Sequence, residues 1–440
     1  MVIDPLQGWR RTHSSSMIGP NLNGKEVTIF GWIEDIRDLG KILFLTLRDN
    51  EGLLQITVHR EDAEEGVLKK IGRIGKQYAV GVKGLVKAND KAPRGFEIVP
   101  SQIKILGIAE HPLPLDPRGR VPADMKVRFD ARILDLRRTS CRAIFKIRHV
   151  ILREIKNFLY ERGYLEINTP KIIATATEGG ATLFPVEYFG DKAFLAQSPQ
   201  LYKEQLTGVF EKVFEVGIYF RAEEFHTRRH LNEYTSLDIE EAFVTQEDVM
   251  STLEQMIKFV FEKTNFECKE ELKALKRKII IPKIPFKRIS YDEIIKVLKE
   301  SEIIVEWGED IPTQGEKRLE ELYKNELFFI VDWPTTIKPF YILPKKDDEN
   351  YCHSFDLMYG GLELASGGTR IHDHDLLVKR LKEQGLNPEN FGYHLNTFKW
   401  GMPPHAGAGL GLERLLMAIT GVKNIRECVL FPRDKERLYP

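Results

Sequence analysis

The sequence contains few cysteines and no long apolar run. Its four cysteines, Cys141, Cys268, Cys352 and Cys428, stand far apart and form no C-x-x-C pair. This spacing argues against a zinc knuckle or a disulfide framework, so we expect all four to be packing residues. No apolar stretch approaches the roughly 20 residues of a membrane-spanning helix. The N-terminal segment MVIDPLQGWRRTHSSSM lacks the apolar core of a secretory signal, which predicts a cytoplasmic location.

An excess of charge of either sign is also absent. The 440 residues include 65 basic and 65 acidic side chains. The net charge therefore gives no sign of a nucleic-acid partner, and any contact with RNA must come from local patches and stacking side chains. A chain of this length exceeds the usual size of a single core, so two or three domains are expected.

Short apolar alternations, separated by glycines and by Asp or Asn turns, extend over residues 27–106. This pattern predicts a five-stranded barrel. The leucines of the segment ILFLTLR share one face of a strand, which places Phe44 on the opposite, outward face, and the same alternation places Gln55 outward on the next strand. An outward aromatic beside an amide suits single-stranded bases, which gain about 1–3 kcal/mol each from stacking. An aromatic packed under a loop fits the pattern equally well.

The remaining chain begins with a stretch at 109–138 that is rich in proline and charge and has no sustained period, which predicts a hinge. Apolar residues then recur every three to four positions from Ile144 to Leu159, which predicts an amphipathic helix capped at Gly163. A mixed segment at about 269–345 is interpreted as an insertion carried by a larger domain.

Two segments carry an unusual density of polar residues. The first, FRAEEFHTRRHLNEYTSLDIE, follows an apolar strand and predicts two strands joined by a long charged loop. A solvated loop could hold these charges but would not need Arg221 directly after an apolar strand. The second, SFDLMYGGLELASGG, reads as a strand with the carboxylates Asp356 and Glu363, which alone would be an ordinary strand-edge pair. The glycine run from Gly407 to Arg414 precedes an apolar helix and, alone, indicates only a tight turn.

Three motifs together resemble those of class II aminoacyl-tRNA synthetases. Residues 220–223 (FRAE) and 229–231 (RHL) resemble motif 2, the stretch 161–173 that contains Pro170 resembles motif 1, and residues 407–414 (GAGLGLER) resemble motif 3. Three motifs in the family's order are far more specific than any one of them. The resemblance covers nearly the whole chain.

The resemblance implies an α+β protein in three parts. Residues 1–108 would form an OB-fold β-barrel that binds the anticodon, and residues 109–138 a hinge. Residues 139–440 would form a class II catalytic domain built on an antiparallel β-sheet flanked by helices, with the insertion at about 269–345. Pro170 and the helix before it resemble the segment through which these enzymes form a two-fold homodimer.

The implied chemistry explains the cations of motifs 2 and 3. Joining a carboxylate to the α-phosphate of ATP brings negative groups together, and fixed cations lower that barrier. By resemblance, Arg221 and Arg414 are catalytic: Arg221 bridges the amino-acid carboxylate and the α-phosphate, while Arg414 and His230 hold the γ-phosphate. Glu223 would contact adenine and Tyr234 would stack on it. The further ATP-binding residues that the resemblance implies are Arg229, Leu231, Glu363, Gly411, Leu412 and Glu413.

Magnesium is the expected cofactor beside ATP. The ion takes oxygen ligands. Asp356 and Glu363 supply two carboxylates, and Ser366 a hydroxyl that binds directly or through water.

Lys203 and Arg370 indicate the amino acid. A substrate carboxylate in a closed pocket needs a cation partner, and both residues resemble those of the aspartate enzymes in this family. The asparagine enzymes typically lack a lysine at position 203, and the lysine enzymes would need acidic residues instead. Glu178, which belongs to a glycine-containing lid, would bind the substrate ammonium together with Gln200 and Asp238. The full expected aspartate site is Glu178, Gln200, Lys203, Arg221, Asp238, Ser366 and Arg370.

The barrel bears on the choice of tRNA. By resemblance, Phe44 stacks on an anticodon base, Gln55 reads the central one, and Arg37, in the turn region IRDLG, lies near the anticodon. The compact length resembles archaeal members, some of which charge tRNA(Asn) as well as tRNA(Asp). Where strictly discriminating relatives carry Trp and Lys, this chain has Glu34 and Pro93. Pro93 favours the relaxed form, and Glu34 fits neither pattern.

The resemblance thus implies that L-aspartate is activated with ATP and transferred to the 3′ end of tRNA(Asp), with tRNA(Asn) as a possible second acceptor. An asparagine enzyme and a tRNA-independent amide ligase of the same fold remain alternatives, although the complete barrel argues against the latter. A non-catalytic RNA-binding regulator should have lost Arg221, Glu363 or Arg414, and this chain keeps all three.

Overall fold

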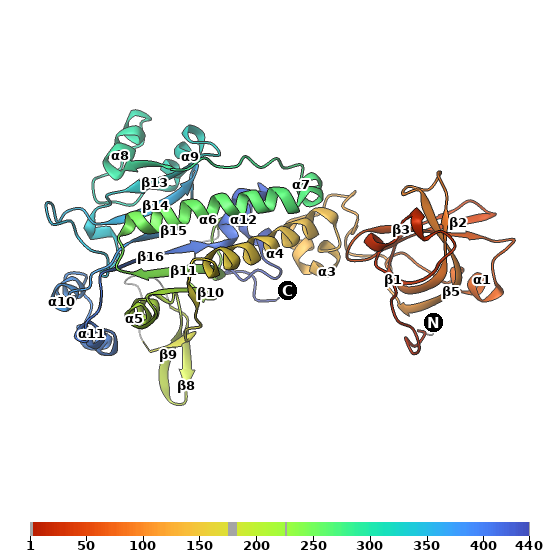
Figure 1. Ribbon diagram of the computed structural model, residues 1–440, viewed down its shortest axis with the longest axis horizontal. Helices are drawn as coiled ribbons and strands as arrows, with labels where there is room; N and C mark the ends of the chain where they lie inside the picture. Colours follow the sequence, from red (N-terminus) through yellow and green to blue (C-terminus); the bar gives the residue numbers. More distant parts are fainter. Residues whose placement is uncertain (1–2, 175–182, 225–226, 440) are drawn as a thin grey trace. The chain divides into compact units, whose positions relative to one another are not determined.

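The computed structural model describes residues 3–174, 183–224 and 227–439. The chain divides into two compact units, Met1–Ala123 and Asp124–Pro440, both drawn in Figure 1. Within the described ranges, no helix combines the length and the apolarity needed to cross a membrane. The four cysteines are buried free thiols, which confirms their prediction as packing residues.

The first unit is a closed five-stranded barrel, as predicted. Two short 3-10 helices precede it, and apolar side chains from all five strands fill its interior. The elements are η1 (Ser15–Met17), η2 (Pro20–Leu22), β1 (Glu26–Asp38), β2 (Ile42–Arg48), β3 (Leu53–His59), α1 (Glu65–Ile71), β4 (Ala79–Ala88) and β5 (Phe96–Gly107), with the barrel order β1-β2-β3-β5-β4.

The alternation of β2 places Phe44 as the sequence predicts. The leucines of β2 are buried, whereas Phe44 is half-buried on the other face. Phe44 pairs with Thr57, and Gln55 pairs with Thr46 two positions along the β2–β3 register, so both belong to the same face of the barrel. The expectation of a turn at Arg37 is wrong, because β1 continues to Asp38 and Arg37 pairs with Phe44.

The predicted hinge is only partly irregular. Its second half forms two short helices of the second unit, α2 (Met125–Asp130) and α3 (Arg132–Asp135). Arg132 is buried, pairs with Asp135 at 2.7 Å, and donates to the carbonyl oxygen of Leu430. Two of the charges that contributed to the prediction of a hinge are therefore paired inside the fold.

The second unit is built on an eight-stranded sheet, which is antiparallel except for the pairs β10–β6 and β12–β13. This arrangement confirms the predicted antiparallel sheet. The strands, in spatial order, are β12 (Lys287–Ser290), β13 (Leu327–Val331), β14 (Ser354–Tyr359), β15 (Leu362–Thr369), β16 (His405–Gly411), β11 (Glu233–Ala242), β10 (Lys212–Phe220) and β6 (Leu165–Glu166).

Helices cover the sheet and a smaller sheet accompanies it. The predicted amphipathic helix is α4 (Thr139–Tyr160), which packs with α6 (Gln246–Glu267) and α12 (Leu412–Thr420) on one face of the large sheet (Figure 1). The small sheet has the order β7-β9-β8, with β7 (Ile172–Ile173), β8 (Pro185–Tyr188) and β9 (Asp191–Leu195). The other elements are α5 (Gln200–Phe210), α7 (Lys269–Ala274), α8 (Tyr291–Glu300), α9 (Thr313–Leu322), η3 (Thr335–Ile337), α10 (His374–Glu383), η4 (Pro388–Phe391), α11 (Gly392–Phe398) and η5 (Ile425–Cys428).

The two faces of the large sheet differ in chemistry because side chains alternate along each strand. Leu237 and Ile239 of β11 belong to the core beneath the helices, and Phe355 of β14 joins them. Asp238 lies between Leu237 and Ile239, and Asp356 directly follows Phe355, but both carboxylates line a pocket instead. The segment 269–345 contributes to this same sheet, since its strands β12 and β13 extend the sheet beyond β14.

The glycine run of motif 3 is a strand rather than the tight turn that it resembles in isolation. It forms β16, in the middle of the sheet between β15 and β11. Gly407 lies opposite Glu240, and a Cβ atom at Gly407 would clash with the carboxylate of Glu240 and the carbonyl oxygen of Ile239. The glycine therefore permits a buried carboxylate to lie against the neighbouring strand.

We predict that Gly407→Ala destabilises the protein, because the added methyl group overpacks a rigid site, at a typical cost of about 1–3 kcal/mol. Gly392→Ala is the matched control, since a Cβ atom at Gly392 meets no atom within 4 Å. The free energy of unfolding in urea should fall for the first variant only. Equal denaturation midpoints for the two variants would contradict the prediction.

Candidate active site

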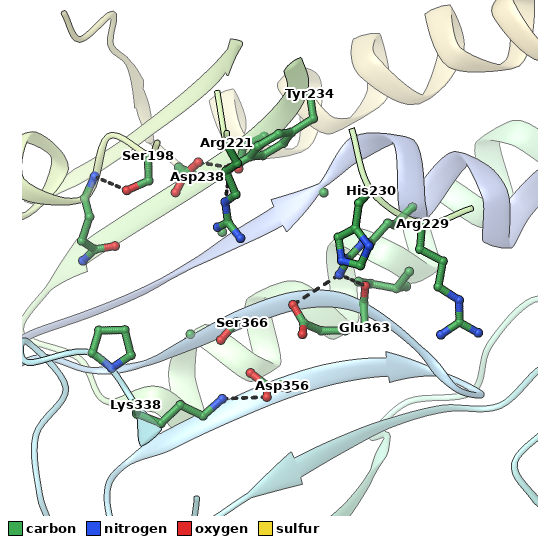
Figure 2. Close-up of a pocket in the computed structure, with 18 of the residues that line it drawn as sticks. Ser198, Arg221, Arg229, His230, Tyr234, Asp238, Lys338, Asp356, Glu363 and Ser366 are labelled. Carbon is green, nitrogen blue, oxygen red and sulfur yellow. Dashed lines mark hydrogen bonds and ion pairs between the residues drawn. The ribbon is translucent and has the colours of Figure 1, made fainter. Parts of the chain in front are cut away.

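A pocket of about 400 Å³ lies on the polar face of the large sheet. β11, β14, β15 and β16 form its floor, and the loop between β10 and β11 forms one wall (Figure 2). The predicted residues that line it are Gln200, Arg221, Glu223, Arg229, His230, Leu231, Tyr234, Asp238, Asp356, Glu363, Ser366, Arg370, Gly411, Glu413 and Arg414. Lys203 and Leu412 are buried outside its lining. Glu178 and its lid lie outside the described residues.

Arg221 begins the loop after β10 and is held by Tyr234. Its Nε donates to the Tyr234 hydroxyl at 3.0 Å, and its guanidinium carbon lies 5.5 Å from the centre of the Tyr234 ring. The same hydroxyl donates to the carbonyl oxygen of Gln197 at 2.9 Å. Figure 2 shows the Arg221 side chain extending into the pocket. A guanidinium held along one edge can bind an anion with its other donors.

A second cationic region combines motifs 2 and 3. Arg414 Nη1 donates to the carbonyl oxygen of Glu363 at 3.0 Å and lies 3.5 Å from its carboxylate. Burial and the nearby Arg414 lower the pKa of His230, so its imidazole is neutral at neutral pH. A neutral imidazole beside a fixed guanidinium provides hydrogen bonding without adding a second charge.

Arg229 is paired with a residue that sequence reasoning missed. Its Nη1 donates to Glu316 of α9 and to the carbonyl oxygen of Gly361, each at 2.9 Å. Glu316 lies in the segment interpreted as an insertion, and nothing in its sequence neighbourhood marks it. The contact connects that segment to the motif 2 loop.

Asp356 and Glu363 lie on two paired strands, β14 and β15, and the expectation of a single strand is wrong. The pair Gly360-Gly361 reverses the chain between them, with Gly360 at a φ of 58°. Asp356 lies directly opposite Ser366, and a register shift follows Leu357. The hairpin thus brings the predicted oxygen ligands to one place.

Lys338 is a second residue that sequence reasoning missed. Its ammonium donates to Asp356 Oδ2 at 2.7 Å and lies 3.9 Å from the centre of the Trp333 ring. Burial raises the pKa of Asp356 to about 6 despite this ammonium. The available signal was a lone lysine in the apolar stretch TTIKPFYIL, which the insertion hypothesis passed over.

The ligand types near Asp356 fit magnesium. Asp356 Oδ1 is buried and makes no hydrogen bond to the rest of the described chain. The described residues contain no cluster of three or more His, Cys, Asp or Glu side chains suited to a metal. Mg²⁺ commonly binds through one or two carboxylates, waters and substrate phosphates. Asp356, Glu363 and Ser366 beside a phosphate site match that pattern.

Lys203 and Arg370 belong to a buried network with Asp238 and Glu240, which we call the four-charge network. Lys203 Nζ lies 3.0 Å from Asp238 Oδ1 and 3.2 Å from Glu240 Oε2. Arg370 donates to both oxygens of Glu240, at 2.8 and 3.3 Å. Arg370 and Asp238 reach the pocket, whereas Lys203 stands behind them and is 1% exposed. Glu240 is the last residue of the charged segment FRAEEFHTRRHLNEYTSLDIE, and the sequence predicted no role for it.

The predicted anticodon residues lie on the barrel of the first unit. The Gln55 amide donates to Glu97 at 3.2 Å, which fixes its orientation, and Arg37 is exposed. Glu34 pairs with the buried Arg48 at 3.0 Å. Pro93 is exposed between β4 and β5.

We predict that Lys203→Leu lowers the free energy of unfolding by about 3–5 kcal/mol, because it leaves Asp238 and Glu240 buried with one cation fewer. Because Lys203 is almost fully buried, its replacement should affect the fold as well as the site. Lys212→Leu is the control, since Lys212 forms a partly exposed pair with Glu241, worth about 0–1 kcal/mol. Urea denaturation measures both, and similar losses would contradict the prediction.

Known proteins resemble the chain over nearly its full length. A family described as tRNA synthetases class II (D, K and N) matches residues 124–435, and an OB-fold nucleic acid binding domain matches residues 27–106. The Aspartate–tRNA(Asp/Asn) ligase of Methanothermobacter thermautotrophicus is 51% identical over 98% of this chain and 99% of that protein. The ligase of the same name from Methanocaldococcus jannaschii is 49% identical, with coverage of 98% and 99%.

Among solved structures, asparaginyl-tRNA synthetase from Pyrococcus horikoshii in complex with asparaginyl-adenylate has a TM-score of 0.93 and 32% identity, over 98% of this chain and 100% of that one. A putative aspartyl-tRNA synthetase from Leishmania major has a TM-score of 0.89 and 28% identity, over 100% and 97%. With its motif residues gathered in one pocket and these matches over both units, the chain belongs to the family of class II tRNA synthetases (D, K and N) with an OB-fold nucleic-acid-binding domain.

Proposed function

We propose that the protein is an aspartate–tRNA ligase, which activates L-aspartate with ATP and transfers it to the 3′ end of tRNA(Asp). The observation that carries the proposal is the four-charge network, whose Arg370 reaches the pocket together with Arg221. The relatives named as aspartate–tRNA(Asp/Asn) ligases, at about half identity over the full chain, support the same reaction.

The first step joins the α-carboxylate of aspartate to ATP. A carboxylate oxygen attacks the α-phosphorus, the bond to the bridging oxygen breaks, and pyrophosphate leaves. Arg221 would lie between the carboxylate and the α-phosphate, and Arg414 and His230 would bind the pyrophosphate end. Such fixed donors stabilise charge as it develops, without reorganising during the step. Glu223 would accept from the adenine amine.

Magnesium would be held by Asp356, Glu363 and Ser366, and when bound it supplies positive charge to the phosphates. Lys338 donates to Asp356 Oδ2, which would leave Oδ1 to bind the ion. This arrangement assigns Lys338 the role of orienting Asp356.

The second step transfers the aspartyl group. A ribose hydroxyl at the 3′ end of tRNA attacks the carbonyl carbon of the adenylate, and AMP leaves. On the barrel, Phe44, Gln55 and Arg37 would contact the anticodon. The exposed Pro93 and the relatives' Asp/Asn names favour charging of tRNA(Asn) as well. The resemblance of the Pro170 region to motif 1 supports a homodimer.

A second candidate is asparagine activation. Two cations and two carboxylates balance in the four-charge network, so a neutral amide could be bound there without an excess of charge. The likeness to the Pyrococcus horikoshii asparagine enzyme points the same way. Lys203 favours aspartate, since the asparagine enzymes typically lack it.

The test is ATP–pyrophosphate exchange with each amino acid. We expect kcat/KM for aspartate to exceed that for asparagine by at least about 100-fold, because Lys203 and Arg370 would interact more strongly with a carboxylate than with a neutral amide. A preference for asparagine, or no exchange with either amino acid, would refute the proposal. Charging of tRNA(Asp) and tRNA(Asn) with radiolabelled aspartate then measures the breadth of tRNA recognition.

We predict that Phe44→Ala reduces kcat/KM for aspartylation of tRNA about 5- to 150-fold, which corresponds to the loss of about 1–3 kcal/mol of stacking. Pyrophosphate exchange without tRNA should be unchanged, because the anticodon takes no part in adenylate formation. Phe266→Ala, at an exposed position at the end of α6, is the control and should alter neither rate. An equal loss of both activities in Phe44→Ala would indicate a packing role.

A further inference from the structure

Glu204 is a fully buried carboxylate that the proposed reaction does not use. It lies on α5, one helical turn after Gln200, whose side chain lines the pocket. Gln200 Nε2 donates to Glu204 Oε1 at 2.5 Å. Because an ionised carboxylate only accepts hydrogen bonds, the amide nitrogen must face Glu204. The amide oxygen of Gln200 is consequently directed away from Glu204.

The second oxygen of Glu204 faces a buried histidine from another helix. His394 of α11 is 0% exposed, and its Nε2 lies 3.2 Å from Glu204 Oε2. Within the described part of the chain neither atom has a partner with full hydrogen-bond geometry, so this 3.2 Å approach is the polar contact that each of them makes. The imidazole nitrogen and the carboxylate oxygen are thus polar partners of each other in the buried interior.

The tautomer of His394 follows from its other neighbour. Gln205 Nε2 donates to the carbonyl oxygen of Leu201 at 2.7 Å, so this atom is the nitrogen of the amide. It lies 3.4 Å from His394 Nδ1, which must then accept. The proton of His394 is accordingly assigned to Nε2, facing Glu204.

These contacts form a directed chain of donors that ends at the pocket. Gln205 donates toward His394, His394 faces Glu204 with its proton, and Gln200 donates to Glu204. Burial raises the pKa of Glu204, but His394, His405 and Arg370 lower it by more. The net effect is a lowered pKa, so the carboxylate remains ionised. An ionised Glu204 keeps the Gln200 amide in one orientation.

We propose that Glu204, held by His394, is a positioning residue that presents the Gln200 amide oxygen to the α-ammonium group of the amino-acid substrate. The inference rests on the proposed function only in that the substrate is an α-amino acid. An ammonium needs acceptors, and a freely rotating amide would present its NH₂ group about as often as its oxygen. A fixed amide always presents its oxygen, so the ammonium group binds more tightly.

Glu204→Gln is the direct test. A carboxamide has one oxygen for the two donors that face it, so the Gln200 amide loses its fixed orientation. In pyrophosphate exchange, KM for the amino acid should rise about 10- to 100-fold, as expected for a weakened hydrogen bond to a charged group. KM for ATP should be unchanged. Glu254→Gln, which alters a buried carboxylate on α6 that accepts from Phe286 N and Arg288, should change neither constant.

A competitor without an ammonium group separates this role from a structural one. Succinate has both carboxylates of aspartate but no α-ammonium, so its inhibition constant should be the same in the wild type and in Glu204→Gln. A parallel weakening of succinate and aspartate would overturn the proposal. If asparagine proves to be the substrate, the proposed function fails but this inference is tested equally well, with succinamate as the competitor.

The double variant Gln200→Glu with Glu204→Gln restores a donor and an acceptor at each contact between positions 200, 204 and 394. The amide introduced at position 204 would donate to the carboxylate introduced at position 200 and accept from His394, and an acceptor would again face the pocket. This double variant should recover the wild-type KM for the amino acid to within a few-fold. It also serves if Glu204→Gln alone does not fold. A folded double variant with a KM as high as that of Gln200→Ala would overturn the proposal.

Discussion

The balance of buried charge on the polar face of the large sheet is the constraint on which the site depends. Lys203 comes from α5, Asp238 and Glu240 from β11, and Arg370 from the end of β15. Isolated ions in such an interior cost several kcal/mol each, so the four side chains are stable only together. Gly407 supplies the room in which Glu240 lies. Three segments that are remote in sequence are thereby held in register beneath the pocket.

The alternation of side chains along the strands explains how one sheet supports both an apolar core and a polar pocket. Alternate residues of β11 and β14 face either the helices or the pocket, so apolar packing on one side fixes the positions of carboxylates on the other. A close-packed core resists displacement of its strands. The packing of α4, α6 and α12 therefore helps to place the pocket residues, together with the four-charge network.

Periodicity and motifs predicted much of this arrangement. The barrel, the helix before Gly163, the strands that flank the motif 2 loop and most of the pocket lining follow from alternation and from the order of the motifs. Three features were missed because they depend on tertiary pairing. Lys338 and Glu316 meet Asp356 and Arg229 only after the segment 269–345 joins the sheet. The sequence does not reveal that Lys203 is buried, because a lysine that binds substrate and a lysine that neutralises a buried carboxylate occur in similar sequence patterns. The helices α2 and α3 were missed because their sequence is rich in charge, and the pairing of Arg132 with Asp135 inside the fold cannot be read from it.

The position of β16 has a consequence for how the protein is made. This strand is synthesised after both of its neighbours, yet it occupies the middle of the sheet, between β15 and β11. Until it is inserted, β11 has an unpaired edge and the carbonyl oxygen of Ala408, which accepts from Lys203, is missing. Pairings of such long sequence separation form slowly and leave exposed edges meanwhile. The sheet therefore lacks its centre until β16 has been synthesised, and the catalytic site cannot form before then.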